Sequence, residues 1–128
     1  MKKYVRRLES VCQKKKIYLR SDISLQKLAK MLGTNRTYLS IIFHEVYNTT
    51  YYGFINSKRV VVAAQLLREK NVTVRDAMIA CGFSSYNSFR DAFREVYGCR
   101  PGEYLRKAKA GLIIAEEEPP MEETTDSF

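Results

Sequence analysis

The side chains best suited to catalysis or metal binding are few in this sequence and are not clustered. Cys12, Cys81 and Cys99 form no CxxC pair, and an odd number of thiols argues against a disulfide-stapled secreted scaffold. The single histidine, His44, has no cysteine or histidine at a ligand spacing, which argues against a zinc site. The acidic residues form no recognisable pair for general acid–base work. We therefore expect no enzyme, no metal and no cofactor, and we expect His44 and Cys81 to be structural.

What the sequence has in excess is positive charge. Its 22 Lys and Arg residues outnumber 14 Asp and Glu residues, for a formal net charge of +8. Six of the acids lie in residues 111–128, so residues 1–110 carry 22 basic and 8 acidic side chains, a formal charge of +14. A small body with that charge favours polyanionic partners. Because 45% of the residues are hydrophobic, the chain can also bury a core and is not a disordered basic arm.

The sequence shows no membrane-spanning or secretory segment. No apolar run approaches the length that crosses a bilayer. The basic start, MKKYVRRLES, is not followed by the apolar stretch of a signal peptide. We therefore expect a soluble cytoplasmic protein in which this segment makes no contact with a membrane.

An internal repeat indicates which elements carry the function. The stretch LQKLAKMLGTNRTYLSIIFHEVYN is similar to VRDAMIACGFSSYNSFRDAFREVYG, with one extra residue after the glycine of the second copy. The matching positions lie 49 residues apart before that insertion and 50 apart after it: Leu25/Val74, Leu28/Ala77, Leu32/Cys81, Gly33/Gly82, Phe43/Phe93, Glu45/Glu95, Val46/Val96, Tyr47/Tyr97 and Asn48/Gly98. Two copies are too few for a solenoid, so we interpret them as one supersecondary unit used twice.

Each copy has the pattern of a helix-turn-helix motif. A short amphipathic helix is followed by a glycine that can adopt positive φ, and then by a helix of about a dozen residues. In the first copy, small Ala29 lies where two steeply crossing helices would approach most closely. An ordinary helical hairpin is the alternative for a single copy, and the repetition within a basic body favours the helix-turn-helix.

Helix-capping residues support these boundaries. Ser24 and Thr73 are suited to cap the first helices, and Asp76 stands three residues after Thr73 as in a capping box. The second helices have two candidates each: Thr34 or Asn35, and Ser84 or Ser85.

A helix over residues 52–69 is expected to join the two motifs. We predict an apolar stripe of Ile55, Val62 and Leu66 on it, flanked by Phe54, Val61 and Leu67. At about 1.5 Å per residue this helix is roughly 27 Å long, which compares with the ~34 Å between successive major grooves on one DNA face.

Three stretches carry a family resemblance: LQKLAKMLGTNRTYLSIIF, FINSKRVVVAAQLLRE and ACGFSSYNSFRDAFREVYGCRPGEYLRK. Residues 19–107 thereby resemble the DNA-binding domain of AraC/XylS-type bacterial transcription regulators. The most specific positions are in the second half: Gly82, Phe83, Phe89, Phe93, Gly98, Pro101 and Tyr104. The resemblance implies an all-α, seven-helix fold with two helix-turn-helix motifs joined by a long central helix. We divide the chain into an N-terminal helix (1–18), this DNA-binding domain (19–109) and an acidic, disordered tail (110–128).

The resemblance also implies which residues contact DNA, and it implies that Arg59 of the long helix is structural. The first recognition helix would use Asn35, Arg36, Thr37, Tyr38, Ser40 and Ile41, and the second Ser84, Ser85, Tyr86, Asn87, Ser88, Arg90 and Asp91. Apart from the resemblance, we expect Arg94 to bind DNA without regard to its sequence. These side chains suit the task, because arginine bonds guanine in a bidentate manner, asparagine bonds adenine, and hydroxyls reach bases or phosphates.

Three positions depart from the family pattern. Ile41 and Asp91 stand where an arginine is common; Ile41 suits a thymine methyl group, whereas a carboxylate accepts from cytosine but is repelled by phosphate. In the second motif the usual small residue falls at Met78, with Ala77 before it. We therefore expect the first motif to read DNA more strongly than the second.

The expected function is sequence-specific binding of double-stranded DNA, as a bacterial transcription regulator or as the output domain of a larger one. RNA polymerase is a further expected partner. Two alternatives stay open for regulation: an effector or dimerisation domain upstream of Met1, or a protein that acts alone as some short members of the family do. The alternative is a general basic module for nucleic acids or anionic surfaces. For the tail, either a solvated disordered end or competition of Glu116–Glu118 and Glu122–Glu123 with DNA for the basic face fits the sequence.

Overall fold

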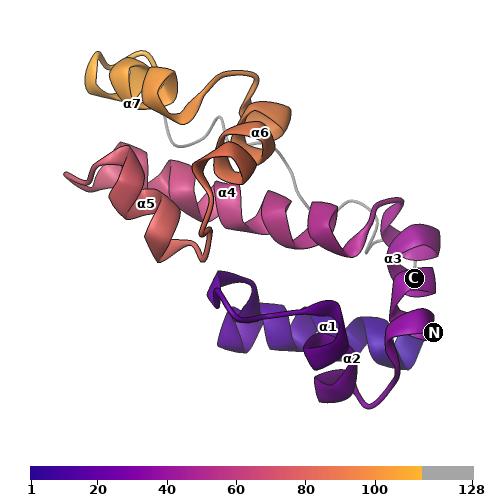
Figure 1. Ribbon diagram of the computed structural model, residues 1–128. Helices are drawn as coiled ribbons and strands as arrows, with labels where there is room; N and C mark the ends of the chain where they lie inside the picture. The colour runs from indigo at the N-terminus through magenta and orange to yellow at the C-terminus, as the bar shows by residue number, and fades with distance from the viewer. Residues whose placement is uncertain (114–128) are drawn as a thin grey trace.

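In the computed structural model, which describes residues 1–113, the chain folds into helices (Figure 1). This part of the chain has seven α-helices, one short 3-10 helix and no β-strand. The bounds are α1 (Lys2–Lys15), η1 (Ile17–Leu19, the 3-10 helix), α2 (Leu25–Leu32), α3 (Arg36–Tyr47), α4 (Tyr51–Glu69), α5 (Val74–Ala80), α6 (Tyr86–Tyr97) and α7 (Pro101–Lys109). The all-α, seven-helix expectation is confirmed. The acidic residues of the expected tail, from Glu116 onward, lie outside the described residues.

Four predicted helix starts are confirmed by side-chain caps. Ser24 Oγ accepts a hydrogen bond from the Lys27 N–H (3.1 Å), and Thr73 and Asp76 form the reciprocal capping box. The structure also decides the two open choices, because Asn35 caps α3 and Ser85 caps α6. Each cap supplies an acceptor for an N–H group that a helix start leaves unpaired.

The core consists of two buried clusters joined by α4. Side chains of α1, η1, α2, α3 and the start of α4 form the first cluster, and the rest of α4 with α5, α6 and α7 forms the second. In Figure 1, α4 crosses the middle of the molecule, with α1 and α2 below it, α3 at its N-terminal end, and α5, α6 and α7 around its C-terminal half.

The single apolar stripe predicted on α4 is wrong. Val62 and Leu66 are only half-buried at the edge of the second cluster. Instead, α4 buries two faces: Tyr51, Phe54 and Ile55 in the first cluster, and Val60, Ala63, Ala64 and Leu67 in the second. At about 100° per residue these faces lie roughly half a turn apart around the helix. A helix that serves two cores at its two ends needs two faces, which a search for one stripe does not find.

Helix α1 packs as part of the first motif. Its inner residues Val5, Leu8 and Cys12 belong to the same cluster as α2 and α3. Their spacing recurs 55 residues later in the second half of α4, as Val60, Ala63 and Leu67. The structural repeat is therefore a three-helix unit, α1–α2–α3 followed by α4–α5–α6, with α7 added at the end.

The two turn glycines of the repeat have positive φ angles, a backbone conformation that residues with a side chain rarely adopt. Gly33 has φ +81° and Gly82 has φ +92°. A Cβ atom on Gly33 would lie 3.1 Å from the Arg7 guanidinium, and one on Gly82 would lie 2.6 Å from the Leu19 carbonyl oxygen. The second turn is thus packed directly against the backbone of η1, which brings the two halves of the molecule together.

The departure at Ala77 and Met78 does not prevent the second motif from forming. Ala77 is fully buried, whereas Met78 is half-buried at the edge of the second cluster. Ala77 is therefore the small residue that allows close packing of α5, one position earlier than in the family pattern.

Candidate nucleic-acid interface

Helix α3 presents a polar face to solvent because its opposite face is completely buried. Leu39, Ile42 and Phe43 are each 0% exposed. The Asn35 Oδ1 atom accepts a hydrogen bond from the Tyr38 backbone N–H (2.9 Å), which fixes the first turn. The expected contact residues on the solvent side are all exposed: Asn35, Arg36, Thr37, Ser40 and Ile41.

Tyr38 differs from the other expected contact residues of the first motif. It is half-buried, and its ring packs edge-on against Tyr4 of α1, with 5.6 Å between the ring centroids. Tyr38 therefore lies on the flank of α3, where the helix meets α1, rather than at the centre of the exposed face.

Helix α6 is built in the same way. Phe89 and Phe93 are fully buried, and Ser85 Oγ accepts from the Ser88 N–H (3.3 Å) at the helix start. The structure places the expected contact residues of this N-terminal end together in solvent: Ser84, Ser85, Tyr86, Asn87 and Ser88.

The two charged residues that follow are paired with each other. Arg90 Nε lies 3.0 Å from Asp91 Oδ1, and the Arg90 guanidinium also lies 6.0 Å from the Tyr86 ring centroid. The Arg90 side chain is 29% exposed and that of Asp91 is 59% exposed. Arg90 can offer both edges of its guanidinium to a guanine only if it leaves Asp91. Arg94, one turn later, is exposed.

Asp91 also borders a groove of about 840 Å³ between α6 and the start of α4. Tyr52, Asn56 and Lys58 of α4 line it, together with Asp91 and Glu95 of α6. Two carboxylates face one lysine there, so this stretch between the two motifs lacks the positive excess of the rest of the surface.

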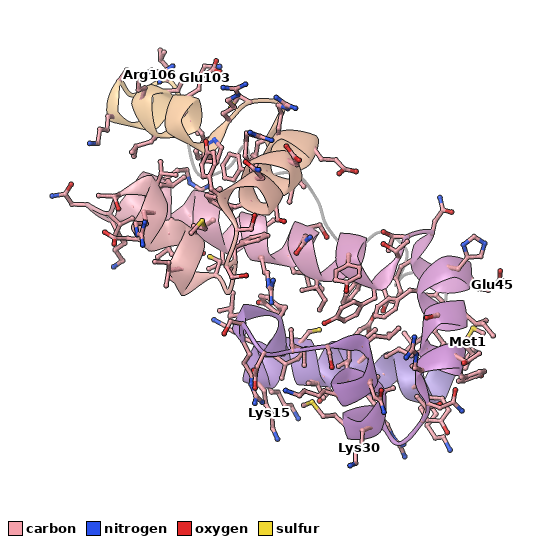
Figure 2. The ribbon with its side chains drawn as sticks, viewed as in Figure 1. Met1, Lys15, Lys30, Glu45, Glu103 and Arg106 are labelled. Atoms are coloured by element: carbon pink, nitrogen blue, oxygen red, sulfur yellow. The ribbon has the colours of Figure 1, made fainter. Side chains whose placement is uncertain are left out.

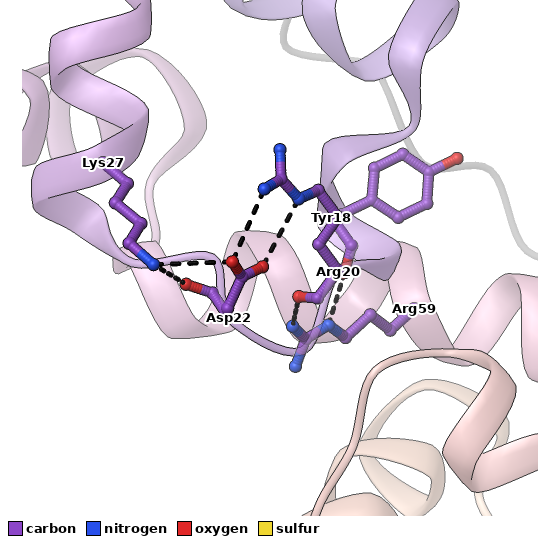
Figure 3. A network of polar contacts seen from close by, with 5 residues as sticks. All are labelled: Tyr18, Arg20, Asp22, Lys27 and Arg59. Carbon is purple, nitrogen blue, oxygen red and sulfur yellow. Dashed lines mark hydrogen bonds and ion pairs between the residues drawn. The ribbon is translucent and has the colours of Figure 1, made fainter.

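Arg59 joins the two motifs at their junction (Figure 3). From α4, its Nε donates to the Tyr18 carbonyl oxygen and its Nη2 donates to the Arg20 carbonyl oxygen (2.9 Å). Its guanidinium lies 5.3 Å from the centroid of Phe83, directly after Gly82 in the second turn. Burial lowers the pKa of Arg59. The resemblance implied a structural role for Arg59, and these contacts confirm it.

Beside this junction, the loop before α2 is held by an exposed ionic network. Asp22 Oδ2 accepts a hydrogen bond from Arg20 Nη2 (3.4 Å), and the Asp22 carboxylate forms ion pairs with Arg20 (Nε–Oδ1 3.3 Å) and Lys27 (Nζ–Oδ2 3.5 Å) (Figure 3). Lys27 also donates to the Asp22 carbonyl oxygen. Arg20 first, and Lys27 second, lower the pKa of the Asp22 carboxyl. The network orders the entry to the first motif.

The remaining reactive side chains are structural or isolated. Cys81 is fully buried, and burial raises the pKa of its thiol to about 12, so it is not a nucleophile at neutral pH. His44 is exposed in the last turn of α3. Within residues 1–113, no group of three or more His, Cys, Asp or Glu side chains could hold a metal ion. None of the helices in this range is long and apolar enough to cross a membrane.

Comparison with known proteins places this architecture in a family. A family model described as "Helix-turn-helix domain" matches residues 28–107. The chain belongs to the helix-turn-helix family of AraC-type regulators. Its motifs are therefore helix-turn-helix motifs, with α3 and α6 as the recognition helices, and not ordinary helical hairpins.

Individual AraC-type relatives are similar over this domain. The virulence regulon transcriptional activator VirF of Yersinia enterocolitica is 30% identical over 79 residues, which cover 62% of this chain and 29% of VirF. The chain spans about a third of the length of such curated relatives.

Solved structures share the fold. The C-terminal domain of AraT, a response regulator from Geobacillus stearothermophilus, aligns with a TM-score of 0.72 at 23% identity and covers 94% of both chains. The DNA-binding domain of AdpA, solved in complex with a target DNA, aligns with a TM-score of 0.71 at 23% identity, over 81% of this chain and 94% of that one.

Sequence reasoning missed the contribution of α1 to the first motif. Arg7 of α1 donates from Nη1 to the Leu32 carbonyl oxygen (2.8 Å), at the turn between α2 and α3. The signal was present in the apolar spacing that α1 shares with the second half of α4. The similarity between residues 25–48 and 74–98 does not include α1, so the repeat in the sequence does not indicate that α1 belongs to the unit.

Proposed function

We propose that the chain binds double-stranded DNA in a sequence-specific manner and is the DNA-binding part of a bacterial transcription regulator. The observation that carries the proposal is the pair of exposed polar faces on α3 and α6, the second helices of a repeated motif whose two copies share α4. The formal charge of +14 over residues 1–110 supports a polyanionic partner. In this arrangement α3 and α6 enter successive major grooves.

The chemistry of each face assigns the contacts. On α3, Arg36 is suited to guanine, Thr37 and Ser40 to bases or phosphates, and Ile41 to a thymine methyl group. On α6, Asn87 is suited to adenine. The serines at the start of α6 and Arg94 are suited to phosphates.

The first motif is proposed as the stronger reader. Arg36 has no ion pair among the described residues, whereas Arg90 is held by Asp91. An arginine without an ion pair offers both edges of its guanidinium and its full charge to a guanine, whereas Asp91 occupies one edge of Arg90, so α3 contributes more to base discrimination than α6.

Selection of bound duplexes from a random DNA pool tests the proposal. We expect enrichment of one two-part site, with the logarithm of the binding constant falling linearly with the logarithm of salt at about −0.9 per neutralised phosphate. RNA and anionic vesicles serve as competitors. Equal binding to all duplexes, or displacement by RNA or vesicles at the same concentration as by the selected DNA, would instead indicate a general basic module.

A pair of arginine variants separates reading from phosphate binding. Arg36→Ala is expected to cost about 1–3 kcal/mol on the selected site and to relax the preference at one base pair. Arg94→Ala is expected to weaken all sequences alike and to lower the salt slope by about one. Both are measured by fluorescence anisotropy on the selected site and on single-base variants of it.

The wider setting follows from the same proposal. A promoter-binding protein works at the bacterial chromosome, so we place it in the cytoplasm with the nucleoid. Contact with RNA polymerase and an effector domain preceding this domain are further expectations from the family resemblance. The chain's basic domain would supply the DNA-binding step in each case.

A further inference from the structure

Helix α1 carries a strong positive charge that the recognition helices do not account for. Among residues 2–15 the basic side chains are Lys2, Lys3, Arg6, Arg7, Lys14 and Lys15, and all of them are exposed. The one acidic side chain of the helix, Glu9, accepts a hydrogen bond from the Tyr47 hydroxyl (3.1 Å). The basic residues form two groups, one at each end of α1, and only one end is next to α3.

The N-terminal group is attached to the turn of the first motif. Arg7 Nη1 donates to the carbonyl oxygen of Leu32, the last residue of α2 (2.8 Å). The same nitrogen lies 3.1 Å from where a Cβ atom of Gly33 would be. The Arg7 guanidinium is therefore fixed beside the turn that leads into α3, while its other nitrogens make no hydrogen bond to the described residues.

Lys3 is held beside Arg7 by an aromatic contact. The Lys3 ammonium lies 5.0 Å from the centroid of the Tyr4 ring, and the Arg7 guanidinium lies 5.5 Å from it. Tyr4 packs edge-on against Tyr38 of α3. Two cations are thus placed on the flank of the first recognition helix by a ring that contacts that helix directly.

The two ends of α1 differ in their surroundings. In Figure 2, the Met1 end lies beside α3, where Glu45 is labelled, whereas Lys15 lies at the far end of α1. Lys14 and Lys15 carry the same charge as Lys3 and Arg7, but within residues 1–113 no hydrogen bond, ion pair or ring contact connects them with α3 or its turn.

We propose that Lys3 and Arg7 form a contact surface for the DNA phosphate backbone bordering the groove that α3 enters. In a helix-turn-helix complex, the N-terminal residues of the recognition helix contact bases while the preceding helix crosses the backbone. A cation fixed at the turn between these helices lies close to that backbone. Neither Lys3 nor Arg7 has an ion pair among residues 1–113, so both charges are available to a phosphate. The inference rests on the proposed function and adds α1 to its interface.

Charge-matched double variants of the full chain test the inference. Lys3→Gln/Arg7→Gln and Lys14→Gln/Lys15→Gln each remove two positive charges from α1. Binding to the selected duplex is measured between about 50 and 200 mM salt, a range in which the number of phosphate contacts strongly affects the affinity. We expect the first pair to lower the salt slope by roughly 1.8, at about 0.9 per contact, and the second pair to leave it unchanged. Base preference is expected to be the same for all three proteins.

A single variant controls for the structural role of Arg7. Lys3→Gln leaves the hydrogen bond from Arg7 to Leu32 in place and is expected to lower the slope by about 0.9. Equal slopes for the wild type and the Lys3→Gln/Arg7→Gln variant would overturn the inference, as would equal losses for the two double variants. In either case specific binding by the wild type would leave the proposed function standing, whereas no binding of duplex DNA by the wild type would overturn both.

Discussion

At the scale of single residues, the polar faces of the two motifs have similar compositions, but their arginines differ in how freely they can contact DNA. Arg36 is exposed at the start of α3, while Arg90 shares its charge with the neighbouring carboxylate of Asp91 at 3.0 Å. The carboxylate of Asp91 occupies the Nε edge of Arg90 and offsets its charge, so Arg90 has only its Nη1/Nη2 edge left for a base and attracts phosphates less strongly. The two motifs are therefore expected to discriminate bases unequally.

Removal of the Asp91 charge is expected to strengthen DNA binding. Asp91→Asn frees Arg90 and takes a negative charge away from approaching phosphates. We expect tighter binding by about 1 kcal/mol, or roughly fivefold, with a new guanine preference in the second half-site. Anisotropy titrations and a repeated selection measure the two effects. Glu95→Gln, which removes a carboxylate from the same groove, is the control, and equal gains for the two variants would contradict a role for the Arg90–Asp91 pair.

Alkaline pH is expected to destabilise the fold through Tyr51. Burial raises the pKa of Tyr51 to about 12 from its usual value near 10. Above pH 10 the unfolded phenol loses its proton while the folded phenol keeps it, so the free energy of unfolding falls as pH rises towards 12. The buried thiol of Cys81 acts in the same direction from about pH 9.

Urea unfolding between pH 8 and 11 measures this dependence. Tyr51→Phe is expected to decline less steeply with pH than the wild type. The matched control is Tyr52→Phe, because the Tyr52 side chain is 72% exposed. An identical decline for Tyr51→Phe and the wild type would count against the role of Tyr51.

At the scale of elements, capping chemistry predicted the helix starts well. The caps at Ser24, Thr73 and Asp76 are local, so a few neighbouring residues determine them. The two faces of α4 and the role of α1 depend on what packs against these helices from elsewhere in the chain. The pairing of Arg90 with Asp91 depends on the side-chain conformations that the fold selects. These features were not predictable from local sequence for that reason.

Any side chain at Gly82 in the second turn is expected to destabilise the fold. Its φ of +92° is strained for other residues, and an added Cβ atom would lie 2.6 Å from the Leu19 carbonyl oxygen. Gly82→Ala is expected to lower the free energy of unfolding by at least about 1–3 kcal/mol. Gly102→Ala is the control, because nothing lies within 4 Å of that position, and it is expected to be neutral or stabilising in α7. Urea denaturation measures both, and similar stabilities for the two variants would exclude the packing role of the turn.

At the scale of the whole molecule, two separate cores share one helix. The clusters lie on opposite faces of α4, and Arg59 with Gly82 connects the second turn to η1. The distance between α3 and α6 is therefore determined by α4 and by this junction together. A protein built in this way is expected to require a fixed separation of its two half-sites.

Changing the separation of the half-sites tests this rigidity. Five extra base pairs turn the second half-site by about half a helical turn, so binding is expected to fall to that of one half-site. Arg59→Ala is expected to bind the original site more weakly and to lose less affinity on insertion, because the junction no longer fixes the two motifs. Gln65→Ala, exposed on the same helix, is the control. A wild type indifferent to the insertion would show that the motifs are not held in register.

The division of the core has an evolutionary consequence. The first cluster includes the start of α4, the second includes the rest of α4, and the two clusters meet at α4 and at the junction of Arg59 and Gly82 with η1. Substitutions on the exposed face of one motif are therefore expected to leave the buried cluster of the other undisturbed. The DNA preferences of the two halves are thus expected to diverge independently, without loss of either buried cluster.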